Sequence, residues 1–122
     1  MNGIAYQKAY AFAVRVVKAC QWLQAEKKEF VLSKQFLRSG TSIGANLAEA
    51  GGAISTADLS AKVSIAYKEA QETKYWLNLL KDTDYLTAPM HESLMKEADQ
   101  LAALLFSTLK TTRLNVTKAP EL

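Results

Sequence analysis

The feature that most constrains this chain is a hydrophobic period of 3.6 residues that recurs in four long segments. In the first segment the apolar side chains follow one another at steps of four and three: Ala5, Ala9, Phe12, Val16, Ala19 and Leu23. This spacing places apolar side chains on one face of a helix. The four segments predict helices over about residues 3–25, 31–50, 55–84 and 89–115.

Residues between these segments support the division. Ser55 and Asp58 stand in N-cap and third-position spacing, and Pro89 is tolerated only in the first turn of a helix. We expect Gly51 and Gly52 to end the second helix in the left-handed conformation. Connections of about four to six residues demand antiparallel neighbours. We therefore predict an all-α fold, an antiparallel up-down-up-down four-helix bundle, as a single domain over residues 1–122.

Composition removes most catalytic possibilities. Cys20 is the single cysteine and His91 the single histidine, which excludes an internal disulfide and mechanisms that need two imidazoles. Ferritin-like metal sites need glutamate three residues before histidine, and Ala88 occupies that position. An enzyme using Glu69 and Glu72 would need a pocket between the second and third helices. We expect a protein with no enzymatic activity, no catalytic residue, no metal and no cofactor.

Charge is distributed unevenly along the chain. Residues 1–48 carry seven Lys and Arg against two acidic residues, whereas the whole chain has a net charge of +3. This asymmetry is typical of proteins with an anionic partner, although a solvated helix face is the alternative. Because Lys8, Arg15 and Lys18 interrupt the N-terminal apolar stretch, we expect no membrane segment and a cytoplasmic protein.

One edge of the first helix combines basic and aromatic residues, namely Lys8, Arg15, Lys18 and Trp22. Such an edge suits phosphate contacts and base stacking. The alternative is an ordinary solvated face, with Trp22 packed under lysines or against another subunit. Three C-terminal cations could extend the patch: Lys110, Arg113 and Lys118.

The apolar face of the first helix is broader than one neighbour needs. It continues through Tyr6, Ala13, Val17 and Cys20. Either two helices or another subunit must cover this face. Gly40 and Gly44 in the second helix mark close approach of another helix, since glycine inside a helix costs about 1 kcal/mol against alanine. Together, the broad face and the glycines favour self-association.

A polar stripe runs along the second helix beside its apolar row: Gln35, Arg38, Ser42, Asn46 and Glu49. The third helix has a similar mixed edge at Ile65, Glu69, Glu72 and Trp76. We expect Arg38 to pair with Glu69 or Glu72 at an interior site, or with a neighbouring subunit. Breaking a buried pair costs about 3–5 kcal/mol, against about 0–1 kcal/mol for an exposed one.

Residues 33–49 read SKQFLRSGTSIGANLAE, and residues 66–77 read AYKEAQETKYWL. The first string resembles the signature of the 23S rRNA-intervening-sequence protein family, whose core is Gln-x-x-Arg-x-x-x-Ser-Ile-x-x-Asn-[Ile/Leu]-x-Glu. The second resembles the family's other block. The resemblance covers about residues 4–115. One departure is Ala50-Gly51, where many members read Glu-Gly directly.

This resemblance implies a four-helix bundle that assembles into a ring-shaped homopentamer without known catalytic activity. A related branch, the accessory variability proteins of diversity-generating retroelements, uses a basic pentamer to hold a reverse transcriptase and nucleic acid. The resemblance assigns structural or interface roles to Gln35, Arg38, Ser42, Asn46, Glu49, Glu69 and Glu72. Two hypotheses remain: a homopentamer that binds RNA, DNA or a nucleic-acid enzyme through the first helix, and a purely structural or protein-interaction oligomer.

Overall fold

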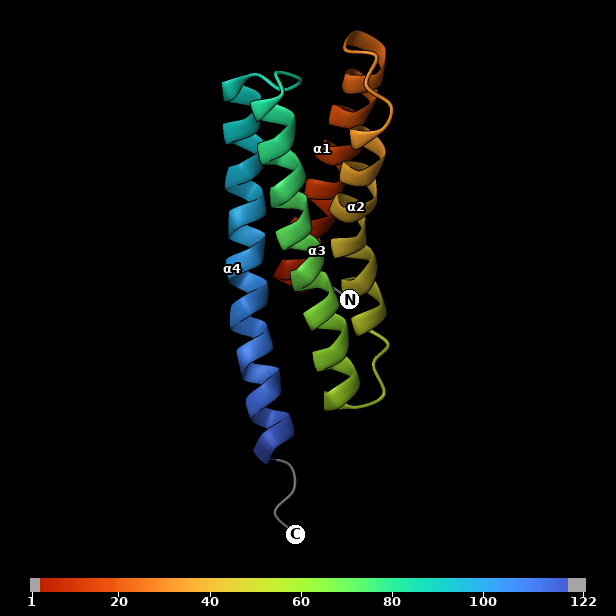
Figure 1. Ribbon diagram of the computed structural model, residues 1–122. Coiled ribbons are helices and arrows are strands. Elements are labelled where there is room, and N and C mark those ends of the chain that lie inside the picture. The colour runs from red at the N-terminus through yellow and green to blue at the C-terminus, as the bar shows by residue number, and fades with distance from the viewer. Residues whose placement is uncertain (1–2, 119–122) are drawn as a thin grey trace.

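The computed structural model describes the backbone of residues 3–118 and the side chains of residues 3–112. Within that range the chain forms helices and no strand. The helices are α1 (Ile4–Glu26), α2 (Leu32–Ala50), α3 (Thr56–Asp82) and α4 (Ala88–Lys118) (Figure 1). The prediction of an all-α fold with four helices is confirmed, and the observed helix ends lie within about three residues of the predicted ones.

Each helix packs against its neighbours along the chain, and α1 also contacts α4. The α1–α4 pair has the sparsest contact of the four packed pairs. In Figure 1, α1 lies behind the other helices, and the C-terminal part of α4 extends beyond the N-terminal end of α3. No helix in the described part of the chain combines the length and hydropathy needed to cross a bilayer.

The four helices enclose one continuous apolar core. Its largest fully buried side chains are Phe12, Leu23, Phe36, Ile43, Leu47, Leu77, Leu80, Leu101 and Leu105. They come from all four helices and fall on the stripes that the 3.6-residue period predicts. Burial of these side chains is the main stabilising contribution, at about 1.5–3 kcal/mol for each large apolar side chain.

The start of α3 is capped as predicted, whereas the end of α2 is not. The Asp58 N–H donates to the Ser55 hydroxyl at 3.0 Å, which satisfies one free amide of the first turn. Gly51 has φ −63° and ψ −22°, and no glycine among residues 3–118 has a positive φ. The predicted left-handed glycine is therefore wrong. The N–H groups of Gly51, Gly52 and Ala53 instead donate three residues back, which satisfies the last carbonyls of α2 without a left-handed residue.

The acidic end of the first connection caps α2. Glu29 is 7% exposed, and its carboxylate accepts hydrogen bonds from the Ser33 N–H at 2.7 Å and the Val31 N–H at 3.3 Å. The Ser33 hydroxyl donates in return to the Glu29 carbonyl at 2.9 Å. The sequence analysis treated residues 26–29 as a charged connector. Glu29 instead satisfies amides at the start of α2.

The glycines of α2 accommodate α1 of the same chain. A Cβ built on Gly40 would lie 2.8 Å from both methyl groups of Val16, whereas one built on Gly44 would lie 3.7 Å from Ala9. The predicted close approach of a helix is confirmed and is tightest at Gly40. Because α1 covers both positions, these glycines do not support contact with another subunit.

Candidate functional site

The basic and aromatic residues of α1 lie on the flank that faces α4. We call Lys8, Arg15, Lys18 and Trp22 the α1 strip. Arg15, Lys18 and Trp22 line one side of a cavity of about 320 Å³, and Met90 and Leu94 of α4 line the other. Lys8 lines a smaller cavity of about 50 Å³ together with Glu97, Gln100 and Leu101 of α4. The strip therefore borders the α1–α4 seam.

An acidic residue of α4 partly neutralises the α1 strip. Arg15 forms an ion pair with Glu97 and donates to the Ser93 hydroxyl at 2.9 Å. Among the described residues, no ion pair involves Lys8 or Lys18. The Lys27 ammonium lies over Trp22, 5.7 Å from its ring centroid, and adds a cation that the sequence analysis missed. The α1 strip thus retains cations at Lys8 and Lys18, and Lys27 adds a third cation next to Trp22.

The predicted pairing between α2 and α3 is present, but it is not in the interior. Arg38 contacts the Glu69 carboxylate at 3.1 Å and also pairs with Glu72. The Trp76 indole N–H donates to Glu72 at 2.9 Å. This hydrogen bond, together with Arg38, lowers the pKa of Glu72, and the hydrogen bond from Arg38 to Glu72 raises the pKa of Arg38.

The Arg38 side chain is 49% exposed, so the expectation of an interior site is wrong. The reason is its place on the outer edge of α2, from which the long side chain reaches across to two carboxylates of α3. Solvent screens such a pair, and we expect Arg38→Ala to cost about 0–1 kcal/mol rather than the cost of a buried pair.

The remaining polar stripe of α2 makes local contacts. The Ser42 hydroxyl donates to the Arg38 carbonyl at 2.6 Å, and Asn46 donates to the Ser42 carbonyl at 2.8 Å. Glu49 pairs with Lys62 of α3 at 2.7 Å, and Gln35 is exposed. The Lys62 contact raises the pKa of that lysine, with the hydrogen bond to Glu49 as the main cause. Ser42 and Asn46 bond within α2, and Arg38 and Glu49 tie α2 to α3.

The single cysteine is poorly placed for nucleophilic chemistry. Cys20 is 3% exposed, and its Sγ donates to the Ser33 carbonyl at 3.3 Å. Burial raises the pKa of the thiol to about 12. At neutral pH the thiol is therefore protonated, whereas the thiolate is the reactive form.

The single histidine helps to hold α4 against α3. His91 Nε2 lies 2.8 Å from Asn78 Oδ1. Partial burial is the main cause that lowers the pKa of His91, and the positive charge of Lys81 lowers it further. The lower pKa favours the neutral imidazole, which can still donate one hydrogen bond to Asn78.

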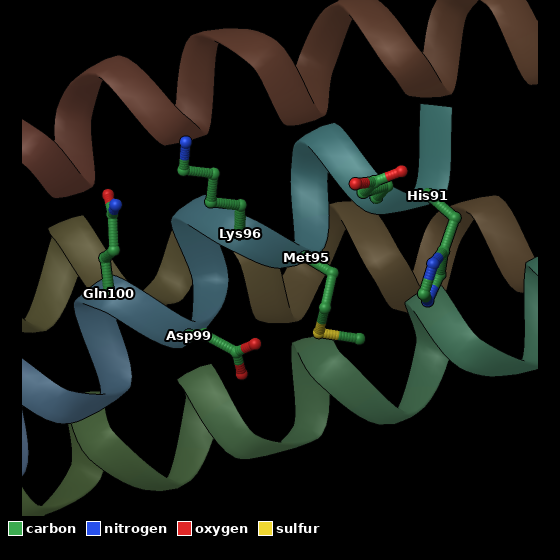
Figure 2. A pocket seen from close by; sticks show the side chains of 6 residues that line it. His91, Met95, Lys96, Asp99 and Gln100 are labelled. Atoms are coloured by element: carbon green, nitrogen blue, oxygen red, sulfur yellow. The ribbon is translucent and has the colours of Figure 1, made fainter. Parts of the chain in front are cut away.

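A shallow depression of about 470 Å³ lies beside His91, and its lining residues all belong to α4. Figure 2 shows that Lys96 and Gln100 point to one side of α4, whereas His91, Met95 and Asp99 point to the other. Asp99 is also paired with Lys74 at 2.9 Å. These side chains do not converge on one point, as the groups of an active site must. Within the described residues, no group of three His, Cys, Asp or Glu residues could hold a metal ion.

A second exposed feature is an apolar face formed by α1 and α2. Tyr10 is 60% exposed, Val14 40% and Val17 39%. Beside them is a groove of about 250 Å³, and its lining consists of aromatic and small residues: Tyr6, Tyr10, Ala13, Thr41, Gly44, Ala45 and Ala48. We call this surface the α1–α2 apolar face. The broad apolar face predicted for the first helix is thus only partly covered by α2 and α4.

The sequence analysis missed the α4 side of the seam. Met90, Leu94, Glu97 and Leu101 follow one another at steps of four, three and four, so they share one edge of α4. That spacing could have been used to predict this edge of α4. It shows which residues share an edge but not which helix that edge meets. Of the predicted C-terminal extension of the strip, Lys110 is exposed and lies over Phe106, whereas Arg113 and Lys118 fall outside the described side chains.

The fold and the site define a class of protein: a small all-α chain of four helices with a basic and aromatic strip along one helix. The family model of the 23S rRNA-intervening sequence protein matches residues 1–107. The chain therefore belongs to the 23S rRNA-intervening sequence protein family.

A solved structure agrees with this assignment. It is the crystal structure of a protein with unknown function from the S23 ribosomal protein family of Bacteroides thetaiotaomicron VPI-5482. It is 50% identical to this chain, with a TM-score of 0.87, and the match covers 88% of this chain and 99% of that chain. No match was found among curated proteins.

Proposed function

We propose that this chain is a non-enzymatic, cytoplasmic protein that assembles into a homopentamer and binds nucleic acid, or a nucleic-acid enzyme such as a reverse transcriptase, through the α1 strip. Three groups of observations support the proposal: the order of the helices, the exposed apolar face, and the cations of the α1 strip. The subunit number of five comes from the family resemblance.

Contacts between consecutive helices support an up-down-up-down order for the bundle. Cys20 contacts Ser33, and Val16 faces Gly40, so residue numbers fall along α1 as they rise along α2. The ion pairs of α2 with α3 follow the same rule, from Arg38 with Glu72 to Glu49 with Lys62. Between α4 and α3, the contacts of His91 with Asn78 and of Asp99 with Lys74 also show residue numbers that rise along one helix and fall along the other.

The α1–α2 apolar face supports self-association. Burial of apolar surface against a second copy stabilises an assembly by about 25 cal/mol per Å² removed from water. Ile4 at the start of α1 is also exposed, as are three apolar residues in the connections that flank α2: Phe30, Val31 and Ile54. Ten large apolar residues are exposed in the described part of the chain, and seven of them lie on α1 or in the connections that flank α2.

The observation that carries the nucleic-acid proposal is a row of cations on one edge of α1, one of which, Lys18, lines a cavity together with Trp22. No ion pair involves Lys8 or Lys18 in the described range, and Trp22 lines the cavity next to Lys18. When ammonium groups contact phosphates, counterions are released from the nucleic acid. This release drives binding. A net charge of +3 for each chain becomes about +15 in a pentamer, and several strips on one particle add avidity.

The test is a titration of a fluorescently labelled single-stranded oligonucleotide, followed by anisotropy at 50 and 200 mM salt. We expect binding at 50 mM that weakens by about 10-fold at 200 mM, as for two or three phosphate contacts. Lys8→Ala with Lys18→Ala should weaken it further. The matched control is Lys68→Ala with Lys81→Ala, which removes the same charge from exposed positions of α3. Undetectable binding at 50 mM, or an equal loss in the control, would refute the proposal.

A purely structural or protein-interaction oligomer is the alternative, and one observation favours it. Glu97 neutralises Arg15, which removes one cation from the strip. The same titration separates the two functions, because the alternative predicts no binding at either salt concentration. An enzyme based on Glu69 and Glu72 has less support, since both carboxylates already contact Arg38.

A further inference from the structure

The larger cavity of the α1–α4 seam combines an aromatic wall, an apolar lining and a basic rim. Trp22 forms the wall, and Ala19, Met90 and Leu94 supply the apolar lining. Its volume of about 320 Å³ is at the low end of the range of about 300–1,000 Å³ typical of ligand pockets. The cavity is therefore suited to one ring system rather than to a large ligand.

Several cations lie around this cavity or along α1 from it. Arg15 is fixed by Glu97 and Ser93 on the α4 side. Lys27 lies over the ring, and Lys18 lines the cavity. Lys8 lies about 15 Å along α1 from Lys18, at a rise of about 1.5 Å per residue. A flexible polyanion that follows α1 therefore passes an ammonium group on each side of Arg15.

We infer that this cavity holds one unpaired nucleobase of single-stranded RNA or DNA, stacked on Trp22, while neighbouring phosphates contact Lys18 and Lys8. The inference rests on the proposed function and adds to it a preference for single strands. In a duplex the bases are stacked on one another and their faces are closed to the indole. In a single strand a base is free to turn towards the protein and stack on an aromatic ring.

The rival occupant is an acidic polypeptide, which would also be attracted to Lys8 and Lys18. The presence of Trp22 in the lining favours the base, because stacking on tryptophan is available to every nucleobase and not to a glutamate side chain. The cavity is also lined by apolar side chains, which gain nothing from contact with a carboxylate.

The experiment compares intact strands with strands of the same length that lack their bases. Labelled oligonucleotides, intact and abasic, are titrated with the full chain at 50 mM salt, in a ribose series and a deoxyribose series. Both members of a series carry the same phosphates. We expect the intact strand to bind roughly 5- to 150-fold more tightly, the range measured for one stacked base. The series in which the intact and abasic strands differ more in affinity identifies the preferred nucleic acid.

Variants of Trp22 provide a second readout. Trp22→Leu keeps an apolar side chain and removes the ring, so intact and abasic strands should then bind equally. Trp22→Tyr keeps an aromatic ring and should retain most of the difference in affinity between intact and abasic strands. Trp76, which hydrogen-bonds to Glu72 on α3, is the control. Trp76→Phe should leave the difference in affinity between intact and abasic strands unchanged. In this variant Trp22 is the sole tryptophan, and the intact strand should quench its fluorescence.

The outcomes separate the inference from the proposed function. Equal binding of intact and abasic strands to the unmodified chain would overturn base stacking and leave phosphate binding standing. Binding of neither strand at 50 mM salt would overturn both. Binding of an oligoglutamate peptide of equal charge as tightly as the intact strand would overturn the nucleobase and favour an acidic protein partner. Because the abasic comparison uses the unmodified chain, misfolding of a variant does not affect it.

Discussion

At the scale of single residues, Glu97 sets the charge of the α1 strip. Its carboxylate pairs with Arg15, and their side chains are 36% and 41% exposed. Glu97→Gln removes this neutralising charge, so Arg15 gains the freedom to contact a phosphate. We predict that single-stranded nucleic acid binds roughly 2- to 5-fold more tightly to Glu97→Gln, the range expected for one exposed ion pair.

Asp99→Asn is the matched control for this prediction. It changes the net charge by the same amount, but Asp99 pairs with Lys74 of α3, away from the strip. The anisotropy titration at 50 mM salt should show no gain for Asp99→Asn beyond the general effect of one charge. Equal gains in the two variants would mean that Arg15 has no part in binding.

The two glycines of α2 predict opposite responses to alanine. Alanine favours a helix by about 1 kcal/mol over glycine at either position. At Gly44 the new methyl group would make ordinary contacts at 3.7 Å, so this gain should appear in full. At Gly40 it would lie 2.8 Å from the methyl groups of Val16, and overpacking of this kind costs about 1–3 kcal/mol.

We therefore expect Gly40→Ala to be less stable than Gly44→Ala by about 1–3 kcal/mol. Urea unfolding at a fixed protein concentration measures the difference, since assembly makes stability depend on concentration. Equal free energies of unfolding would show that α1 moves easily away from Gly40.

At the scale of helices, the start of α2 depends on Glu29. Its carboxylate accepts two backbone N–H groups at the end of the first connection. We predict that Glu29→Ala lowers the free energy of unfolding by about 0.5–2 kcal/mol, the usual effect of removing a cap. Glu26→Ala is the control, because exposed Glu26 ends α1, where a negative charge is unfavourable. Urea unfolding should therefore show no loss for Glu26→Ala, and an equal loss in both variants would argue against the cap.

The helices could be predicted from the sequence because the 3.6-residue period acts within each segment. Ser55 and Asp58 identified the start of α3, and the pairing of Arg38 with α3 followed from two adjacent polar edges. The pairing of Arg15 with Glu97 could not be predicted in the same way. A helical period fixes which residues share a face, but it does not fix how far one helix slides along another.

The conformation at the end of α2 and the exposure of Arg38 were also not predicted from the sequence. Glycine permits a left-handed residue but does not require one, and Gly51 remains in the right-handed region. For Arg38, the position on the helix gave the direction of the side chain, whereas its length carried the guanidinium to the surface. Glu29 was missed because its capping contact depends on the path of the connection.

At the scale of the whole molecule, one claim underlies the account: the exposed apolar face of α1 and α2 meets the same chain in another copy. Tyr10, at 60% exposed, is more exposed than Val14 and Val17 in that face and lines its groove. Contact with another copy would cover it. The nucleic-acid proposal gains from this assembly, because several strips on one particle bind a strand more tightly than a single strip.

The most direct test of this claim is the mass of the chain in solution, measured by sedimentation at micromolar concentration. We predict a particle of five chains of 13.4 kDa each, which Tyr10→Lys dissociates, while Tyr75→Lys on the exposed side of α3 leaves it intact. A single 13.4 kDa species for the unmodified chain would contradict the account.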